Sequence, residues 1–346
     1  LAAWSKQIGV ATSRYPGGTI VKFWDWENPT GNSGQTTDRW NPNFDGIEKP
    51  ASDWMSLDEY LTYVTQSGIR PLFGVNSLSG TLYNREPEGI ARAVRMVEYV
   101  KTKGYGGALW YIGNEEEGMH GSAVGGYAGV FQRYATAMKA VDPNIEICWN
   151  QNTPTSGSIQ SFLNNDGGTA DGFESHGKWA FGPNPTGFGS GTYDQWLTEI
   201  PLRDRKNFRS YRSAANSYRA AAAAVGRSGL KIADNEYGLG VYSGFGKFST
   251  GMMLTEFLME HFIGNWDSAC YWDMSAMIVD KPNGSYRINP IGLGMQLLAD
   301  AQGGEYLGTI ATTASGVHGF AARKDGVPIV YLFNKSGSTH TVNLQL

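Results

Sequence analysis

The chain has 346 residues, of which 41% are apolar and 17% are charged, and its net charge is −4. It is long enough to bury one large core or two modest ones, and without a run of basic residues it is not expected to bind nucleic acid. No apolar stretch approaches the roughly 20 residues that a transmembrane helix needs, so no membrane partner is expected. Two cysteines are too few for a disulfide framework, and no cysteine–histidine cluster has zinc spacing.

The predicted elements begin with a helical stretch over residues 1–6 and then alternate between strands and helices. The first long helix starts at Ser56, because Ser56 and Glu59 form the capping-box pattern, and it stops at Gly68. The seven short apolar segments predicted as parallel strands are 11–15, 69–75, 108–113, 145–149, 172–175, 230–235 and 268–272. This many alternating units favour a (β/α)8 barrel, the TIM barrel, over an open sheet.

The first visible element of this barrel is a helix, so we expect its first strand to lie upstream of residue 1. From about Glu305 the pattern changes to short strands joined by turns. Four such strands are predicted, at 306–313, 317–323, 329–334 and 340–344. The sequence therefore predicts a barrel over 1–303 and part of a small C-terminal β-sandwich-like domain over 304–346.

Two glutamates stand at the carboxyl ends of predicted strands, and each is preceded by Asn. They are Glu115 and Glu236. Barrel active sites are built at this end of the strands, and glycoside hydrolysis needs one carboxyl group to protonate the leaving oxygen and another to attack the anomeric carbon. If either glutamate is considered alone, the alternative to a catalytic role is that it is an exposed charge in a loop. Glu116 and Glu117 follow Glu115 directly, and we expect them to be solvated charges.

Four motifs resemble those of a known group of enzymes. They are Arg14-Tyr15-Pro16-Gly17-Gly18, Trp24-Asp25-Trp26-Glu27, Gly74-Val75-Asn76 and Trp110-Tyr111-Ile112-Gly113-Asn114-Glu115. Over about residues 8–300 the chain resembles retaining glycoside hydrolases of clan A, both the family 51 α-L-arabinofuranosidases and the agarase and porphyranase family 86. In that clan the two catalytic glutamates follow the fourth and seventh strands. Here they follow the third and sixth visible strands, which again implies that one strand is missing.

The resemblance implies a role for each matching residue. Glu115 resembles the acid/base, Glu236 the nucleophile, and Asn114 the residue that hydrogen-bonds the sugar 2-hydroxyl. Arg14 resembles the arginine that orients the nucleophile through charge-assisted hydrogen bonds. Trp272 resembles the tryptophan that forms the floor of the −1 sugar subsite.

Two departures from the family 51 pattern favour the agarase and porphyranase group. Tyr237 follows the predicted nucleophile, where family 51 enzymes usually have Trp. The segment His176-Gly177-Lys178-Trp179, with the long loop after it, is more similar to family 86.

Further substrate-binding residues are expected in the loops. Trp24, Trp26 and Trp179 are predicted to stack on sugar rings, because loop positions rarely need a large ring for packing. His176 could donate to a substrate hydroxyl or, equally, be a structural histidine that bonds nearby backbone. The acidic residues near 25–45 match no calcium loop, so no metal is predicted, and two carboxyl groups suffice without a cofactor.

The sequence thus predicts a secreted or periplasmic retaining hydrolase of a plant or algal polysaccharide, acting as an endo-β-agarase or porphyranase. An exo-acting α-L-arabinofuranosidase is the alternative among enzymes. A non-catalytic glycan-binding protein is the alternative of another class, since loss of the first strand would expose two strand edges. In each case the expected partner is a polysaccharide or oligosaccharide.

Overall fold

The structure is a computed structural model that describes residues 1–29, 40, 54–152, 154–179, 193–204, 209–239, 248–271 and 287–344. The chain separates into two compact units. The first consists of Leu1–Lys6, Ala11–His176 and Ser217–Glu236, and the second of Gln7–Val10, Gly177–Asn216 and Tyr237–Leu346. The predicted boundary between residues 303 and 304 stays a prediction.

All seven segments predicted as parallel strands form strands of one sheet, in the order β1-β2-β3-β4-β5-β9-β10. They are β1 (Thr12–Tyr15), β2 (Arg70–Val75), β3 (Leu109–Ile112), β4 (Glu146–Gln151), β5 (Gly172–Ser175), β9 (Lys231–Leu239) and β10 (Ser268–Tyr271). The pairs from β1 to β9 are parallel. In the described part of the chain β1 and β10 are the ends of this sheet. Residues 2–8 form helix α1, so the first ten residues hold no eighth strand.

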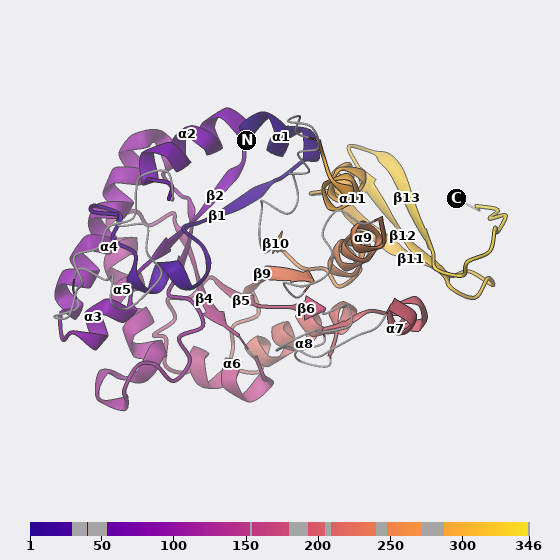
Figure 1. Cartoon of the computed structure of the whole chain (residues 1–346). Coiled ribbons are helices and arrows are strands. Elements are labelled where there is room, and N and C mark those ends of the chain that lie inside the picture. The colour runs from indigo at the N-terminus through magenta and orange to yellow at the C-terminus, as the bar shows by residue number, and fades with distance from the viewer. Residues whose placement is uncertain are drawn as a thin grey trace. The chain divides into compact units, whose positions relative to one another are not determined.

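Helix α1 (Ala2–Ile8) precedes β1, and further helices connect the successive parallel strands. The connecting helices are α2 (Leu57–Ser67), α3 (Leu78–Leu82), α4 (Glu86–Val100), α5 (Gly126–Val141), α6 (Ser156–Leu163), α8 (Tyr211–Ala223) and α9 (Phe248–Ile263). Figure 1 shows α2, α4 and α5 on the outside of β1 to β4. The predicted capping box is present at the start of α2: the Ser56 hydroxyl accepts from the Glu59 amide, and the Glu59 carboxylate accepts from the Ser56 amide.

Aromatic side chains on the outer face of the sheet anchor the helices. Trp149 of β4 stacks on Phe162 of α6 at 4.4 Å between ring centroids, and Phe173 of β5 meets Tyr218 of α8 edge-on at 5.4 Å. Successive strand residues point to opposite faces. The neighbours of these aromatic residues along each strand therefore face the inside of the sheet, where the polar groups of the site lie.

The second unit contains a small antiparallel sheet packed on two helices. Its strands are β11 (Glu305–Ile310), β12 (Val317–Lys324) and β13 (Val327–Asn334), drawn in yellow in Figure 1. Helix α9 packs against α11 (Pro290–Ala299) and against β11 and β12. The fourth strand predicted at 340–344 is wrong. Residues 340–344 have no regular structure and are mostly exposed, so no partner strand holds them in place.

The remaining elements are short. They are the helical turns η1 (Gly18–Phe23), η4 (Lys101–Tyr105) and η5 (Ser122–Val124), helix α7 (Tyr193–Thr198), and the two-residue strands β6 (Lys178–Trp179), β7 (Arg203–Asp204) and β8 (Arg209–Ser210). No helix in the described ranges has the length and apolar character to cross a membrane.

Candidate active site

The predicted catalytic side chains gather at the carboxyl ends of the strands of the first unit. Arg14 lies on β1, Glu115 follows β3, His176 follows β5 and Glu236 lies near the end of β9. In parallel barrels these ends meet at one edge and form the site. Arg14 and Glu236 are 222 positions apart in sequence, yet their side chains are in direct contact, as expected for residues at neighbouring strand ends.

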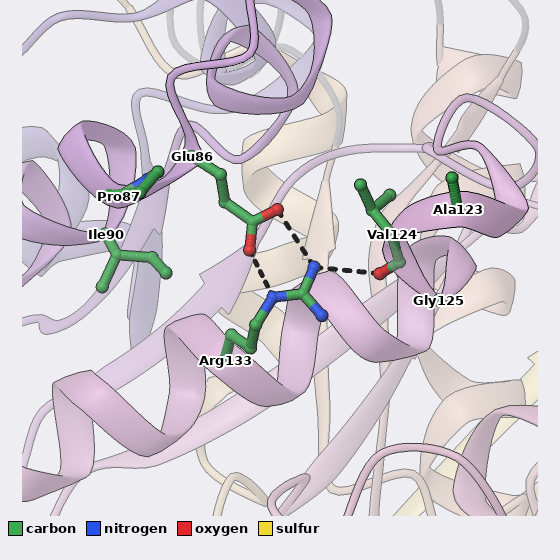
Figure 2. A pocket seen from close by; sticks show the side chains of 7 residues that line it. All are labelled: Glu86, Pro87, Ile90, Ala123, Val124, Gly125 and Arg133. Carbon is green, nitrogen blue, oxygen red and sulfur yellow. Dashed lines mark hydrogen bonds and ion pairs between the residues drawn. The ribbon is translucent and has the colours of Figure 1, made fainter.

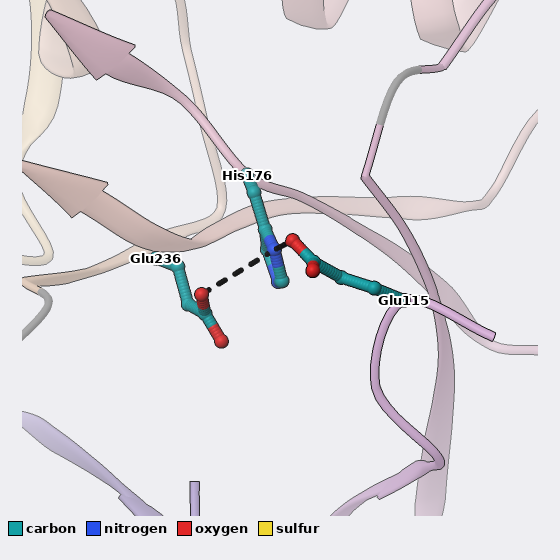
Figure 3. A group of neighbouring side chains, drawn as sticks. All are labelled: Glu115, His176 and Glu236. Atoms are coloured by element: carbon teal, nitrogen blue, oxygen red, sulfur yellow. Dashed lines mark hydrogen bonds and ion pairs between the residues drawn. The ribbon is translucent and has the colours of Figure 1, made fainter. Parts of the chain in front are cut away.

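Glu115, His176 and Glu236 form one group, with the imidazole between the two carboxyl groups (Figure 3). Nδ1 of His176 lies 2.6 Å from Oε1 of Glu115 and 3.4 Å from Oε2 of Glu236. One ligand-type atom from each of the three residues lies within 4.8 Å of the other two. The side chain of Glu115 is 27% exposed, whereas that of Glu236 is 5% exposed. Only one of the two carboxyl groups is thus open to solvent to an appreciable degree.

Arg14 ties the predicted nucleophile to the predicted sugar-binding amide. Its Nη1 donates to Oε1 of Glu236 and its Nη2 donates to Oδ1 of Asn114, both at 2.7 Å. The guanidinium also lies over the Tyr111 ring at 4.1 Å. Burial alone would lower the pKa of Arg14, but Tyr111 and Glu236 raise it above its ordinary value. Arg14 therefore stays charged and holds Glu236 by a charge-assisted hydrogen bond.

The loop that carries Glu115 is folded around Glu116. Glu116 is fully buried, and its Oε2 accepts from the Ser77 hydroxyl and lies 2.6 Å from Nε2 of His120. Its carboxyl group fills the space where a side chain on Gly113 would begin, because a Cβ there would lie 2.4 Å from the carboxyl carbon. Glu115 itself has a positive φ of 50°, which a non-glycine residue rarely adopts. The expectation that Glu116 is a solvated charge is therefore wrong: Glu116 anchors the turn that presents Glu115.

Three polar side chains below this group were not predicted from the sequence. Asn150 of β4 and Glu174 of β5 are paired in register and face the inside of the sheet, as does Asn235 of β9. Asn235 donates to the Glu174 carboxyl group. Burial raises the pKa of Glu174 to about 7, against the effect of Arg14. No motif surrounds Asn150 or Glu174, and only their inward position on strands marks them.

Trp24, predicted to stack on a sugar, is 5% exposed. Its ring lies edge-on to Tyr15 at 5.9 Å and to Trp54 at 6.4 Å. Those contacts are core packing in the first unit, apart from the Glu115 group. The stacking role of Trp24 stays a prediction, and these contacts give it no support.

The predicted substrate-binding roles of Trp26, Trp179 and Trp272 also stay predictions. The indole nitrogen of Trp26 donates to the backbone oxygen of Arg92 at 3.2 Å, and its ring lies 5.4 Å from that of Tyr99. The side chain of Trp179 and the whole of Trp272 lie outside the described residues.

Two groups among the described residues could each place three ligand atoms around a cation. They are Glu115, His176 and Glu236, and Glu256, Glu260 and His318. In the first group Arg14 already holds Glu236. In the second, Lys335 lies 3.0 Å from both oxygens of Glu256, and Arg212 bonds both oxygens of Glu260. Basic side chains thus already pair with Glu236, Glu256 and Glu260, and we assign no metal to either group.

A surface pocket of about 800 Å³ in the first unit lies apart from these residues. It is lined by Glu86, Pro87, Ile90, Ala123, Val124, Gly125 and Arg133. Figure 2 shows that the Arg133 guanidinium pairs with both oxygens of Glu86 and donates to the backbone oxygen of Val124. Its polar groups therefore satisfy one another, and none of the predicted site residues lines it.

Comparison with known proteins points to arabinofuranosidases. A family model described as an α-L-arabinofuranosidase 1 domain matches residues 5–176, the segment that holds Arg14, Asn114, Glu115 and His176. The resemblance to clan A glycoside hydrolases is confirmed. The same findings support the predicted class of enzyme, a glycoside hydrolase.

Two curated relatives match part of the chain. An intracellular exo-α-(1→5)-L-arabinofuranosidase of Streptomyces lividans is 28% identical over 156 residues, which are 41% of this chain and 23% of the relative. An exo-α-(1→6)-L-arabinofuranosidase of Bifidobacterium longum is 27% identical over 155 residues, again 41% of this chain and 29% of the relative. The matched segments thus span less than a third of either relative.

The fold of the whole chain is similar to that of solved clan A enzymes. A family 51 α-L-arabinofuranosidase from Bifidobacterium longum superposes with a TM-score of 0.70 at 16% identity, over 98% of this chain and 76% of that one. The predicted TIM-barrel architecture is confirmed, with seven parallel barrel strands in the described residues and a small C-terminal β-sheet.

Two predictions need correction. The preference for an agarase or porphyranase has no support, because the matching family and the curated relatives are arabinofuranosidases. The residue after Glu236 and the segment 176–179 were too short a basis for choosing between families. The prediction of a secreted or periplasmic protein is contradicted by the Streptomyces lividans relative, which is named an intracellular enzyme. That prediction rested only on the expected polysaccharide substrate, and no residue of the chain supported it.

Proposed function

We propose that the chain is a retaining glycoside hydrolase that acts as an exo-α-L-arabinofuranosidase. The observation that carries the proposal is the Glu115–His176–Glu236 group, in which atoms of the two carboxyl groups lie within 4.8 Å of each other. Retaining enzymes hold the two carboxyl groups about 5–5.5 Å apart, whereas inverting enzymes need about 6.5–9.5 Å to admit a water molecule. The 4.8 Å limit applies to one oxygen of each carboxyl group, and this close approach favours the retaining arrangement, so we propose a double displacement.

In this mechanism Glu236 is the nucleophile and Glu115 the acid/base. A carboxylate oxygen of Glu236 attacks the anomeric carbon while Glu115 gives its proton to the departing glycosidic oxygen. Glu115, now ionised, removes a proton from water, and that water breaks the ester bond between the sugar and Glu236. Their surroundings suit these roles, because Arg14 pairs with the buried Glu236 carboxyl group and Glu115 is the more exposed of the two.

The choice of an arabinofuranoside as substrate is supported by the matching family and by both curated relatives. Both relatives are named exo-acting enzymes, so we propose exo action, and the name of the Streptomyces lividans relative supports an intracellular location. Asn114, held by Arg14, is proposed to bind the sugar 2-hydroxyl.

The test is a turnover panel of an aryl α-L-arabinofuranoside, arabinan, agarose and porphyran, with the anomer of the first product followed by proton NMR. We expect hydrolysis of the arabinofuranosides with retention of configuration. Turnover of agarose or porphyran alone would replace this proposal by the agarase alternative. Binding of these glycans by calorimetry without any turnover would favour the glycan-binding alternative.

A further inference from the structure

We infer that Asn150 is a positioning residue that holds His176 as the neutral tautomer with its single proton on Nδ1. His176 then offers one N–H group to the two catalytic carboxyl groups. The inference rests on the proposed function only in taking Glu115 and Glu236 as the reacting groups. The protonation of His176 can be measured without any substrate.

The orientation of the Asn150 amide is fixed by the backbone. Asn150 is fully buried, and its Oδ1 lies 2.7 Å from the backbone nitrogen of Glu115. A backbone N–H group can only donate, so the atom facing it must be the amide oxygen. The other end of the Asn150 side chain is therefore the NH2 group.

That NH2 group decides the protonation of His176. Nδ2 of Asn150 lies 2.7 Å from Nε2 of His176 and 3.4 Å from Oδ1 of Asn235. An amide NH2 can only donate, so Nε2 of His176 must accept and carries no proton. A doubly protonated imidazole would place two donors face to face in a buried site, which costs as much as an unmade hydrogen bond. The remaining tautomer has its proton on Nδ1.

Nδ1 faces both carboxyl groups, at 2.6 Å from Glu115 and 3.4 Å from Glu236. Among the described residues Glu117, in the loop after β3, also interacts electrostatically with His176, while Arg14 on β1 and Glu174 on β5 interact with Glu236. A neutral imidazole supplies one hydrogen bond without adding a second positive charge beside Arg14. Its N–H can stabilise Glu115 in the second step of the reaction, when Glu115 must be ionised to take a proton from water.

The first experiment is 15N NMR of the full chain with labelled histidine. The chain has five histidines, and the His176→Gln variant assigns the signals of His176. At about pH 7 we expect a protonated Nδ1 and an unprotonated Nε2. A proton on Nε2, or a doubly protonated ring, at this pH would overturn the inference whatever the activity of the protein.

The second experiment changes the donor into an acceptor. In Asn150→Asp one carboxylate oxygen can still accept from the Glu115 amide, while the other now accepts from Nε2–H, so His176 should become doubly protonated. The positive ring would favour ionised Glu115, and the alkaline limb of the kcat/KM profile should move by about one unit to lower pH.

The matched control is Asn152→Asp, which adds the same charge two residues further along the chain and should leave both the histidine signals and the pH profile as in the wild type. A singly protonated His176 in Asn150→Asp would show that the Asn150 amide is not what keeps the second proton away. If Asn150→Asp does not fold, the wild-type spectrum still decides the tautomer. If the wild type hydrolyses no glycoside, the proposed function fails while the tautomer is read independently.

Discussion

Each of the two units holds a cluster of glutamates, and the two clusters differ in their access to solvent. In the second unit the side chains of Glu256 and Lys335 are both fully buried, and both Glu256 oxygens are bonded. In the first unit Arg14 satisfies Glu236, while Glu115 is 27% exposed. The buried Glu256–Lys335 ion pair is out of reach of a substrate and therefore has a structural role. The partly exposed Glu115 can be reached by a sugar and can take part in a reaction.

This comparison predicts the largest effect for Glu236→Gln. The variant loses the attacking oxygen, so turnover of an aryl arabinofuranoside should fall on the order of 10⁴-fold or more. Azide should restore turnover and give the product of opposite anomeric configuration, because it attacks directly in place of Glu236. The rates and the anomer are measured by NMR. An azide product of retained configuration would move the nucleophile elsewhere.

Glu115→Ala should lose about 10²–10⁴-fold, and most with substrates whose leaving group is another sugar, because only such leaving groups need a proton. An activated aryl glycoside should still react with the enzyme, and azide should rescue turnover with retained configuration. Glu117→Ala is the control and should stay within a few-fold of the wild type.

Glu116→Ala cannot serve as such a control, because Glu116 is buried and holds the turn beneath Glu115. Loss of activity in Glu117→Ala with activity kept in Glu115→Ala would mean that the acid/base was assigned to the wrong glutamate.

The sequence predicted the parts of the site that follow from strand ends and from motifs. A Gly-Asn-Glu turn after one apolar strand and an Asn-Glu pair after another were enough to predict that Glu115 and Glu236 lie together, while their catalytic roles stay predictions. Sequence could not find Asn150, because its role comes from contacts with the Glu115 amide and the His176 ring, which lie 35 and 26 positions away. For Trp24 and Glu116 it gave the wrong environment, since burial depends on which segments pack around a loop. The substrate could not be predicted, because substrate choice depends on contacts made by several loops and no short sequence motif specifies them.

In the sealed cluster of the second unit, Glu256→Gln should reduce stability and leave activity nearly intact. The change removes the carboxylate that is bonded to the buried Lys335, which costs about 3–5 kcal/mol of unfolding free energy. Burial already lowers the pKa of Lys335. The double variant Glu256→Gln with Lys335→Met should recover most of the loss, because it removes both charges. Urea unfolding and arabinofuranoside turnover of the same samples test this, and a fall in turnover at unchanged stability would contradict it.

The smallest predicted effect concerns Glu174, whose basic neighbour Arg14, in the part of the chain that the structure describes, also pairs with Glu236. Its carboxyl group shares Arg14 with Glu236, and burial raises its pKa from 4.5 to about 7. Between these values the folded chain keeps a proton that the unfolded chain has lost, so the unfolding free energy falls as pH rises, by about 3 kcal/mol in all. Glu174→Gln removes this titration. Its stability relative to the wild type should therefore increase from about pH 4.5 to 7 and then stay constant.

Urea unfolding of both proteins at closely spaced pH values measures that difference. Glu59→Gln is the control, for which we expect the opposite pH dependence. Hydrogen bonds from Ser56 lower the pKa of Glu59 in the folded protein. This variant should therefore lose stability relative to the wild type as pH rises through that pKa. Parallel stability curves for the wild type and Glu174→Gln would mean that Glu174 ionises like an ordinary carboxyl group. The attraction of Arg14 would then offset the burial of Glu174 in addition to its pairing with Glu236.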